Sequence, residues 1–155
     1  MKNICLGIDP GMTGAIAVIG DGSLLSVHDM PTVGRGKAGK QAVNASGLAE
    51  LIRSIRLPHP GTHFIACVEE VSGRPPPGRK PGAQSMFNFG RGAGVIDGVI
   101  ATLGMQLTTV APSKWKKHFN LINTEKAAAR GKATDLFPEA PLARTEDLGR
   151  AAANL

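Results

Sequence analysis

An apolar strand that ends in a carboxylate constrains this chain more than any other feature. Residues 3–8 form the predicted strand, and Asp9 follows it directly. Pro10 and Gly11 then force a turn, because neither residue extends a central strand. Burying a carboxylate costs on the order of several kcal/mol unless it is paired or binds a metal. Asp9 is therefore either a ligand-binding acid or a residue that caps its own turn through the backbone.

Three antiparallel strands joined by short turns are predicted for the first part of the chain. Residues 15–19 form a second apolar run, and the Asp21-Gly22 pair after it is a hairpin signal. Residues 23–30 are predicted as a third strand, which ends before a proline. Together with residues 3–8, these segments predict an antiparallel meander.

Residues 32–44 are rich in glycine and lysine, and we expect a weakly structured, mobile loop there. Its three cations are Arg35, Lys37 and Lys40. Asn44 or Ser46 can cap the helix that follows, because their side-chain oxygens accept from the backbone N–H groups of the first turn. The predicted apolar stripe of this helix is Leu48, Leu51, Ile52 and Ile55.

A second apolar strand also ends in acids. Residues 63–71 form a continuous apolar run that reaches Glu69 and Glu70, as expected of a strand buried on both faces. The helix between the two strands predicts a parallel crossover beside the first strand. Ligands gather at the carboxyl ends of such strands, so Asp9 and Glu69 should meet there.

Residues 72–84 form a basic loop that leaves directly from this predicted acid pair. Its prolines and glycines exclude a helix or a central strand, and we expect the loop to be mobile. The alternatives are a plain linker and a loop that holds a phosphodiester backbone. Its cations are Arg74, Arg79 and Lys80.

A long helix is predicted over residues 85–103, although it contains four glycines, each of which costs about 1 kcal/mol in a helix interior. Four together indicate close approach of another backbone, either a packed strand or a partner subunit. Residues 105–111 are the predicted fifth strand, and residues 112–119 a short basic helix at its carboxyl end. The cations of this helix are Lys114, Lys116 and Lys117.

Charge and composition narrow the class of partner. The 155 residues carry a net charge of +6, which favours nucleic acid first and an acidic membrane second, with a merely basic surface as the alternative. Five Phe, one Trp and no Tyr make a base-stacking single-strand binder a poor match. No apolar segment is long enough for a signal peptide or a membrane span, so we expect a cytoplasmic protein. Cys5 and Cys67 fall inside apolar strands and are predicted as core residues.

Four stretches of the sequence resemble the RuvC-type Holliday-junction resolvases of the RNase H-like superfamily, particularly their short phage forms. The stretches are residues 7–14, 68–71, 85–94 and 112–117, which together span most of the chain. The resemblance implies an α/β fold in which helices flank a five-stranded mixed sheet, built from a three-strand antiparallel meander and two parallel strands. We expect residues 1–155 to form one nuclease domain of this kind.

The resemblance further implies a homodimeric, Mg²⁺-dependent endonuclease that nicks two opposed strands of a four-way DNA junction. It implies two Mg²⁺ per site, with Mn²⁺ able to substitute, held by the catalytic acids Asp9, Glu69 and Asp147. Helix 85–103 is the predicted dimer surface. We expect six cations to contact DNA phosphates: Arg74, Arg79, Lys80, Lys114, Lys116 and Lys117.

The last predicted helix departs from the family pattern. Leu148 stands where the phage-like pattern has a histidine, and Ala152 stands where it has an acid. Neither side chain can ligate a metal, which predicts weak metal occupancy and slow cleavage. Natural divergence, an inactivating substitution and a non-catalytic junction-binding protein are all compatible with these residues. This helix is predicted from residue 145, with Thr145 as its cap, and no C-capping signal follows before residue 155, so either the sequence is truncated or the chain ends inside the helix.

Sugar kinases and heat-shock ATPases also contain a turn like the one at residues 9–13. They need a second, duplicated domain, for which 155 residues leave no room.

Overall fold

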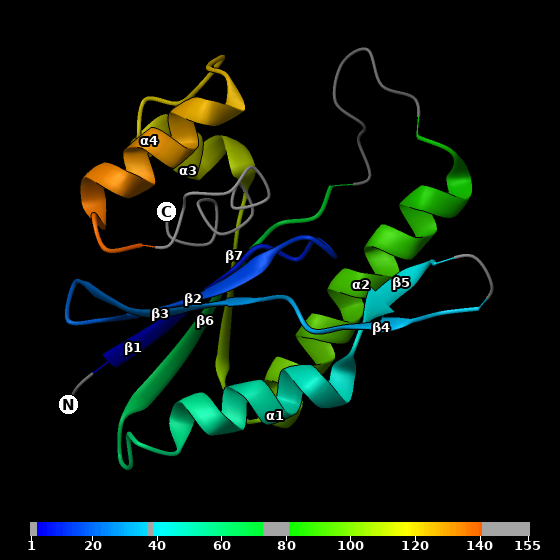
Figure 1. Cartoon of the computed structure of the whole chain (residues 1–155), viewed down its shortest axis with the longest axis horizontal. Helices are drawn as coiled ribbons and strands as arrows, with labels where there is room; N and C mark the ends of the chain where they lie inside the picture. The colour runs from blue at the N-terminus through cyan, green and yellow to red at the C-terminus, as the bar shows by residue number, and fades with distance from the viewer. Residues whose placement is uncertain (1–2, 37–38, 73–80, 141–155) are drawn as a thin grey trace.

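Five strands form the central sheet of the computed structural model, which describes residues 3–36, 39–72 and 81–140. The strand order is β3-β2-β1-β6-β7 (Figure 1). β1 is antiparallel to β2 and parallel to β6, β2 is antiparallel to β3, and β6 is parallel to β7. The predicted five-stranded mixed sheet, a meander plus two parallel strands, is confirmed. The bounds are β1 Asn3–Ile8, β2 Ala15–Gly20, β3 Ser23–Asp29, β6 His63–Glu69 and β7 Gln106–Val110.

Two pairs of helices flank the sheet. In Figure 1, α1 and α2 lie on one side of the strands and α3 and α4 on the other. The predicted helix 85–103 is confirmed as α2, with its start two residues earlier and its end one residue earlier. None of the helices in the described ranges is long and apolar enough to cross a membrane. The bounds are α1 Ala45–Arg56, α2 Ala83–Thr102, α3 Pro112–His118 and α4 Lys126–Leu136.

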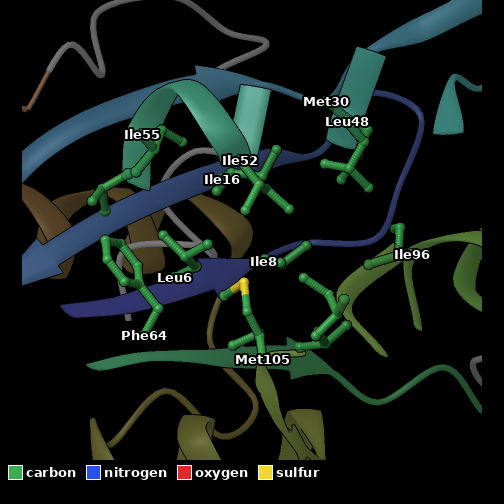
Figure 2. Close-up of a cluster of buried hydrophobic side chains, with 14 of the residues drawn as sticks. Leu6, Ile8, Ile16, Met30, Leu48, Ile52, Ile55, Phe64, Ile96 and Met105 are labelled. Atoms are coloured by element: carbon green, nitrogen blue, oxygen red, sulfur yellow. The ribbon is translucent and has the colours of Figure 1, made fainter. Parts of the chain in front are cut away.

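The main hydrophobic core lies between the sheet and the α1–α2 pair. Figure 2 shows the side chains of Leu48 and Ile52 from α1 near those of Leu6 and Ile8 from β1. Asn44 caps α1 as predicted, because its Oδ1 accepts from the backbone N–H of Gly47 at 3.0 Å. The core therefore fixes β1 under the two helices, and with it the residue that follows β1.

The prediction that β6 is buried on both faces is wrong. Phe64, Ala66 and Val68 are buried against α1 and α2, whereas Ile65 and Cys67 on the opposite face are half-buried. Cys5 lies on that face as well, so neither cysteine is a core residue. The two sulfurs share a hydrogen bond, which lowers the pKa of Cys67 to about 7.

The expected loop at residues 32–44 is largely a β-hairpin. β4 (Thr32–Gly34) pairs antiparallel with β5 (Gln41–Val43) in a separate two-stranded sheet. Strands of three residues among glycines and lysines carry no readable alternation of apolar and polar positions, so the sequence did not reveal them.

The glycines of α2 do not mark a close approach to another strand of the described chain. A methyl group at Gly90, Gly94 or Gly98 would meet nothing within 4 Å, and one at Gly92 would touch only the Val43 side chain, at 3.5 Å. The packed-strand explanation is therefore wrong for the described residues.

Several predicted features lie outside the described residues. They are the cations Arg74, Arg79 and Lys80 of the basic loop, and Asp147, Leu148 and Ala152 of the last predicted helix.

Candidate active site

Asp9 and Glu69 lie at the same edge of the sheet. Ile8 pairs with Val68 in the parallel β1–β6 ladder, so the residues that follow them, Asp9 and Glu69, stand level with each other. Successive side chains of a strand point to opposite faces. Because Ile8 and Val68 are buried toward α1 and α2, both acids belong to the other face, where both are half-buried.

The two carboxylates interact electrostatically. Burial and the negative charge of Asp9 raise the pKa of Glu69, and the positive charge of Lys116 partly offsets this. The predicted meeting of the two acids rests on the β1–β6 register, which places them side by side, and the charge of Lys116 also acts on Glu69.

The turn after β1 holds the Asp9 side chain in place. The backbone N–H of Gly11 donates to Asp9 Oδ1 at 3.1 Å, and the Asp9 N–H donates to the Ala15 carbonyl at 3.0 Å. Gly14 closes the turn by donating to the Gly11 carbonyl at 2.9 Å. A carboxylate has about four acceptor positions, so a side chain that caps a turn in this way can also ligate a cation. The two interpretations of Asp9 are thus compatible.

Lys116 comes from a third element at the same edge. Val110 pairs with Glu69 at the end of β7, and α3 begins directly afterward, with Pro112 in its first turn. Lys116 is half-buried, and its Nζ lies 5.4 Å from the centroid of the Trp115 ring. The other two cations of α3, Lys114 and Lys117, are exposed. All three lysines of α3 were predicted as phosphate contacts. The proximity of Lys116 to Glu69 was not predicted, because it depends on tertiary packing.

Glu70 differs from Glu69 although the two are adjacent. Its side chain is exposed, and its backbone N–H donates to the Val110 carbonyl at 2.9 Å. The alternation of a strand directs it away from the face that carries Asp9 and Glu69.

The acid pair fits part of a divalent-cation site. Carboxylate oxygens are the ligands that Mg²⁺ and Mn²⁺ prefer, and two carboxylates stand next to each other at this edge of the sheet. Within the described ranges, no group of three or more His, Cys, Asp or Glu side chains could hold a metal ion. The predicted third acid, Asp147, is outside those ranges.

Comparison with known proteins supports the fold. No protein-family model matches the sequence, and a search of curated proteins finds no significant match. Among solved structures, RuvC from Thermus thermophilus is similar, with a TM-score of 0.54, 16% sequence identity, and coverage of 97% of this chain and 89% of that one. The same protein in complex with a Holliday junction substrate gives a TM-score of 0.58 at the same identity and coverage. The chain therefore has a RuvC-like fold.

The Asp9 turn yields a first prediction. A methyl group at Gly14 would overlap with the Asp9 carbonyl oxygen and lie 2.8 Å from the Gly11 carbonyl oxygen. A methyl group at Gly11 would instead make an ordinary contact, 3.5 Å from Asp9 Oδ1. Gly14→Ala should therefore destabilise the fold by about 1–3 kcal/mol, and Gly11→Ala by less than about 1 kcal/mol. Denaturant unfolding measures both, and equal losses would contradict this description of the turn.

The pKa of Glu69, raised by burial and by the charge of Asp9, yields a second prediction. A carboxyl whose pKa is raised on folding holds its proton more tightly in the folded state, so its contribution to stability falls as pH rises from its ordinary pKa through the raised one. In metal-free buffer, Glu69→Gln should therefore increase stability at pH 7. The gain should reach at most about 1 kcal/mol, because solvent screens a half-buried pair.

At about pH 4, where an ordinary glutamate is half-protonated or more, the gain from Glu69→Gln should largely disappear. Thermal unfolding at the two pH values measures it. The exposed neighbour supplies the control, since Glu70→Gln should leave stability unchanged at both. A wild-type chain as stable as Glu69→Gln at pH 7 would contradict a raised pKa of Glu69 in the folded state.

Proposed function

We propose that this chain is a structure-selective, metal-dependent DNA endonuclease that binds four-way junctions and nicks them symmetrically. The observation that carries the proposal is the Asp9–Glu69 pair, with Lys116 beside it, at the carboxyl edge of a RuvC-like sheet. The similar Thermus RuvC is recorded in complex with a Holliday junction substrate. Other branched DNA is a possible substrate on the same physical grounds. A single nuclease domain over residues 1–155 and a cytoplasmic location stay predictions from the sequence.

Each side chain has a role in this proposal. Asp9 and Glu69 would hold divalent cations, Mg²⁺ or Mn²⁺, with Asp147 as the third acid and two ions per site. Bound ions of this kind neutralise charge at a phosphate and make water more acidic. Lys116 favours the ionised form of Glu69, which is the form that ligates, and adds positive charge where a phosphate would approach.

DNA affinity would come mainly from cations around the acid edge. Lys114 and Lys117 are exposed on α3, directly after β7. We propose that they contact phosphates together with Arg74, Arg79 and Lys80 of the basic loop. Such contacts release counterions, so affinity should fall steeply as salt rises.

The alternative is a junction-binding protein that cleaves weakly or not at all. Ala152 and Leu148 favour this alternative, because neither side chain supplies the metal-ligating group that is expected at its position. Loss of one ligand weakens a metal site without removing the DNA-binding cations. The two functions therefore differ in chemistry and share their recognition of DNA.

Cleavage of an end-labelled four-way junction in Mg²⁺ tests the function. We expect the unmutated chain to nick slowly, Ala152→Glu to nick at least about ten-fold faster, and Asp9→Asn to give no nicks. The nicks should be symmetric on opposed strands. Junction binding in Ca²⁺ without nicks from any of the three would favour the non-catalytic alternative, and nicking by Asp9→Asn at the unmutated rate would refute the proposed site.

Symmetric nicking needs two sites, and we propose that α2 forms the surface between two copies. Its first half exposes Phe87 and Phe89, with exposed fractions of 63% and 44%. A methyl group at any of three glycines of the helix would meet nothing within 4 Å among the described residues, so a second backbone could approach closely there: Gly90, Gly94 and Gly98.

A matched pair of glycine substitutions tests this surface. Gly94→Arg would place a long cation between the copies, and we expect the dimer to dissociate at least about 30-fold more readily, the effect of an interface hot spot of about 2 kcal/mol. Gly131→Arg is the control, because Gly131 also faces open space but lies on α4. Sedimentation equilibrium measures both. A wild-type monomer, or equal effects of the two substitutions, would exclude α2 as the dimer surface.

A further inference from the structure

The β4–β5 hairpin begins and ends at the same edge of the sheet as the acid pair. β3 runs in the same direction as β1, because both are antiparallel to β2, so both end at this edge. Directly after β3, the Met30 N–H donates at 3.0 Å to the carbonyl of Gly14, which closes the Asp9 turn. Where the hairpin returns, the Asn44 N–H donates to the Pro31 carbonyl at 2.9 Å. The base of the hairpin is therefore fixed to the Asp9 turn.

The hairpin is also braced along its length. The Thr32 hydroxyl donates to Gln41 Oε1 at 2.6 Å across the two strands, and the Arg35 N–H donates to the Lys40 carbonyl at 2.7 Å beyond them. At its base, Val43 is buried in the main core and lies against α2. A braced backbone loses less freedom on binding than that of a flexible loop.

The described cations of the hairpin are free of neighbouring acids in the sequence. Arg35 and Lys40 are both exposed, and the hydrogen bond between their backbones holds them next to each other. No Asp or Glu occurs between Asp29 and Glu50. An exposed pair of cations without acids close by in the chain attracts an anion.

The hairpin and α3 lie at opposite ends of the acid edge. β3, which leads into the hairpin, and β7, which leads into α3, are the outer strands of the sheet, while Asp9 and Glu69 follow the inner strands β1 and β6. In Figure 1 the hairpin and α3 lie on opposite sides of the end of β1. Four strand spacings of about 4.8 Å separate the outer strands by roughly 19 Å. Along the axis of a DNA duplex, where each strand carries one phosphate per about 3.4 Å, that span corresponds to about five or six base pairs.

We propose that the β4–β5 hairpin is a second phosphate-binding arm, which holds the DNA backbone on the β3 side of the acid pair while α3 holds it on the β7 side. Arg35 and Lys40 supply two phosphate contacts. The inference rests on the proposed function, because it takes DNA as the polyanion. DNA is favoured over an acidic membrane, since the cations flank an acid pair that a lipid surface would not use.

Salt-dependent binding of a fluorescent four-way junction in Ca²⁺ tests the arm. Loss of two phosphate contacts lowers the slope of log affinity against log salt by about 1.8, so between 50 and 200 mM salt the double variant Arg35→Gln/Lys40→Gln should lose about 12-fold less affinity than the wild type. The control is Arg53→Gln, which removes an exposed cation from the last turn of α1. Its slope should equal that of the wild type.

The possible outcomes distinguish failure of the phosphate-binding arm from failure of the proposed function. A wild-type chain that binds the junction, with the same slope in the double variant, overturns the arm alone. The arm is also overturned if Arg53→Gln lowers the salt slope by as much per removed charge as the double variant does. The loss of net charge alone would then explain the effect. A wild-type chain that binds phosphatidylserine vesicles but neither the junction nor linear duplex overturns both proposals. Equal melting temperatures of the three proteins confirm that the substitutions leave the fold intact.

Discussion

The placement of two half-buried carboxylates at the ends of adjacent parallel strands is the constraint on which the functional part of the structure depends. Burial and the Asp9 charge raise the pKa of Glu69, so the pair costs stability at neutral pH. The β1–β6 ladder holds the strands level, and the core between the sheet and α1–α2 holds the ladder. The turn closed by Gly14 then fixes Asp9. A rigid fold thus maintains a charge arrangement that a divalent cation would relieve.

The acid pair could be predicted from the sequence because each acid ends an apolar strand. Pro10 and Gly11 stop β1 immediately after Asp9, and the helix between the strands requires the parallel crossover that brings Glu69 alongside. The stripe of α1 was equally readable, since Leu48, Ile52 and Ile55 recur at helical spacing and are buried. In each of these cases local pattern and tertiary packing agree.

Other features depend on contacts that no local pattern encodes. The apolar run of β6 suggested burial on two faces, but α1 and α2 cover one, and Cys67 lies half-buried on the other. The sequence does not distinguish Lys116 from the other cations of its basic helix. Its position near Glu69 depends on the β6–β7 pairing, which places α3. The fold is similar to that of Thermus RuvC although only 16% of the residues are identical. Fold similarity at this identity does not fix the chemistry, which depends on the residues of the site.

Binding of Mn²⁺ is the most direct measurement of the central claim, that Asp9 and Glu69 form a divalent-cation site. Electron paramagnetic resonance of free Mn²⁺ reports the bound fraction without any need for DNA or cleavage. We expect the wild type to bind Mn²⁺ saturably, and Asp9→Asn and Glu69→Gln to bind it at least about ten-fold more weakly. Glu70→Gln should bind Mn²⁺ as tightly as the wild type. Equal binding by the wild type and Asp9→Asn would contradict the central claim.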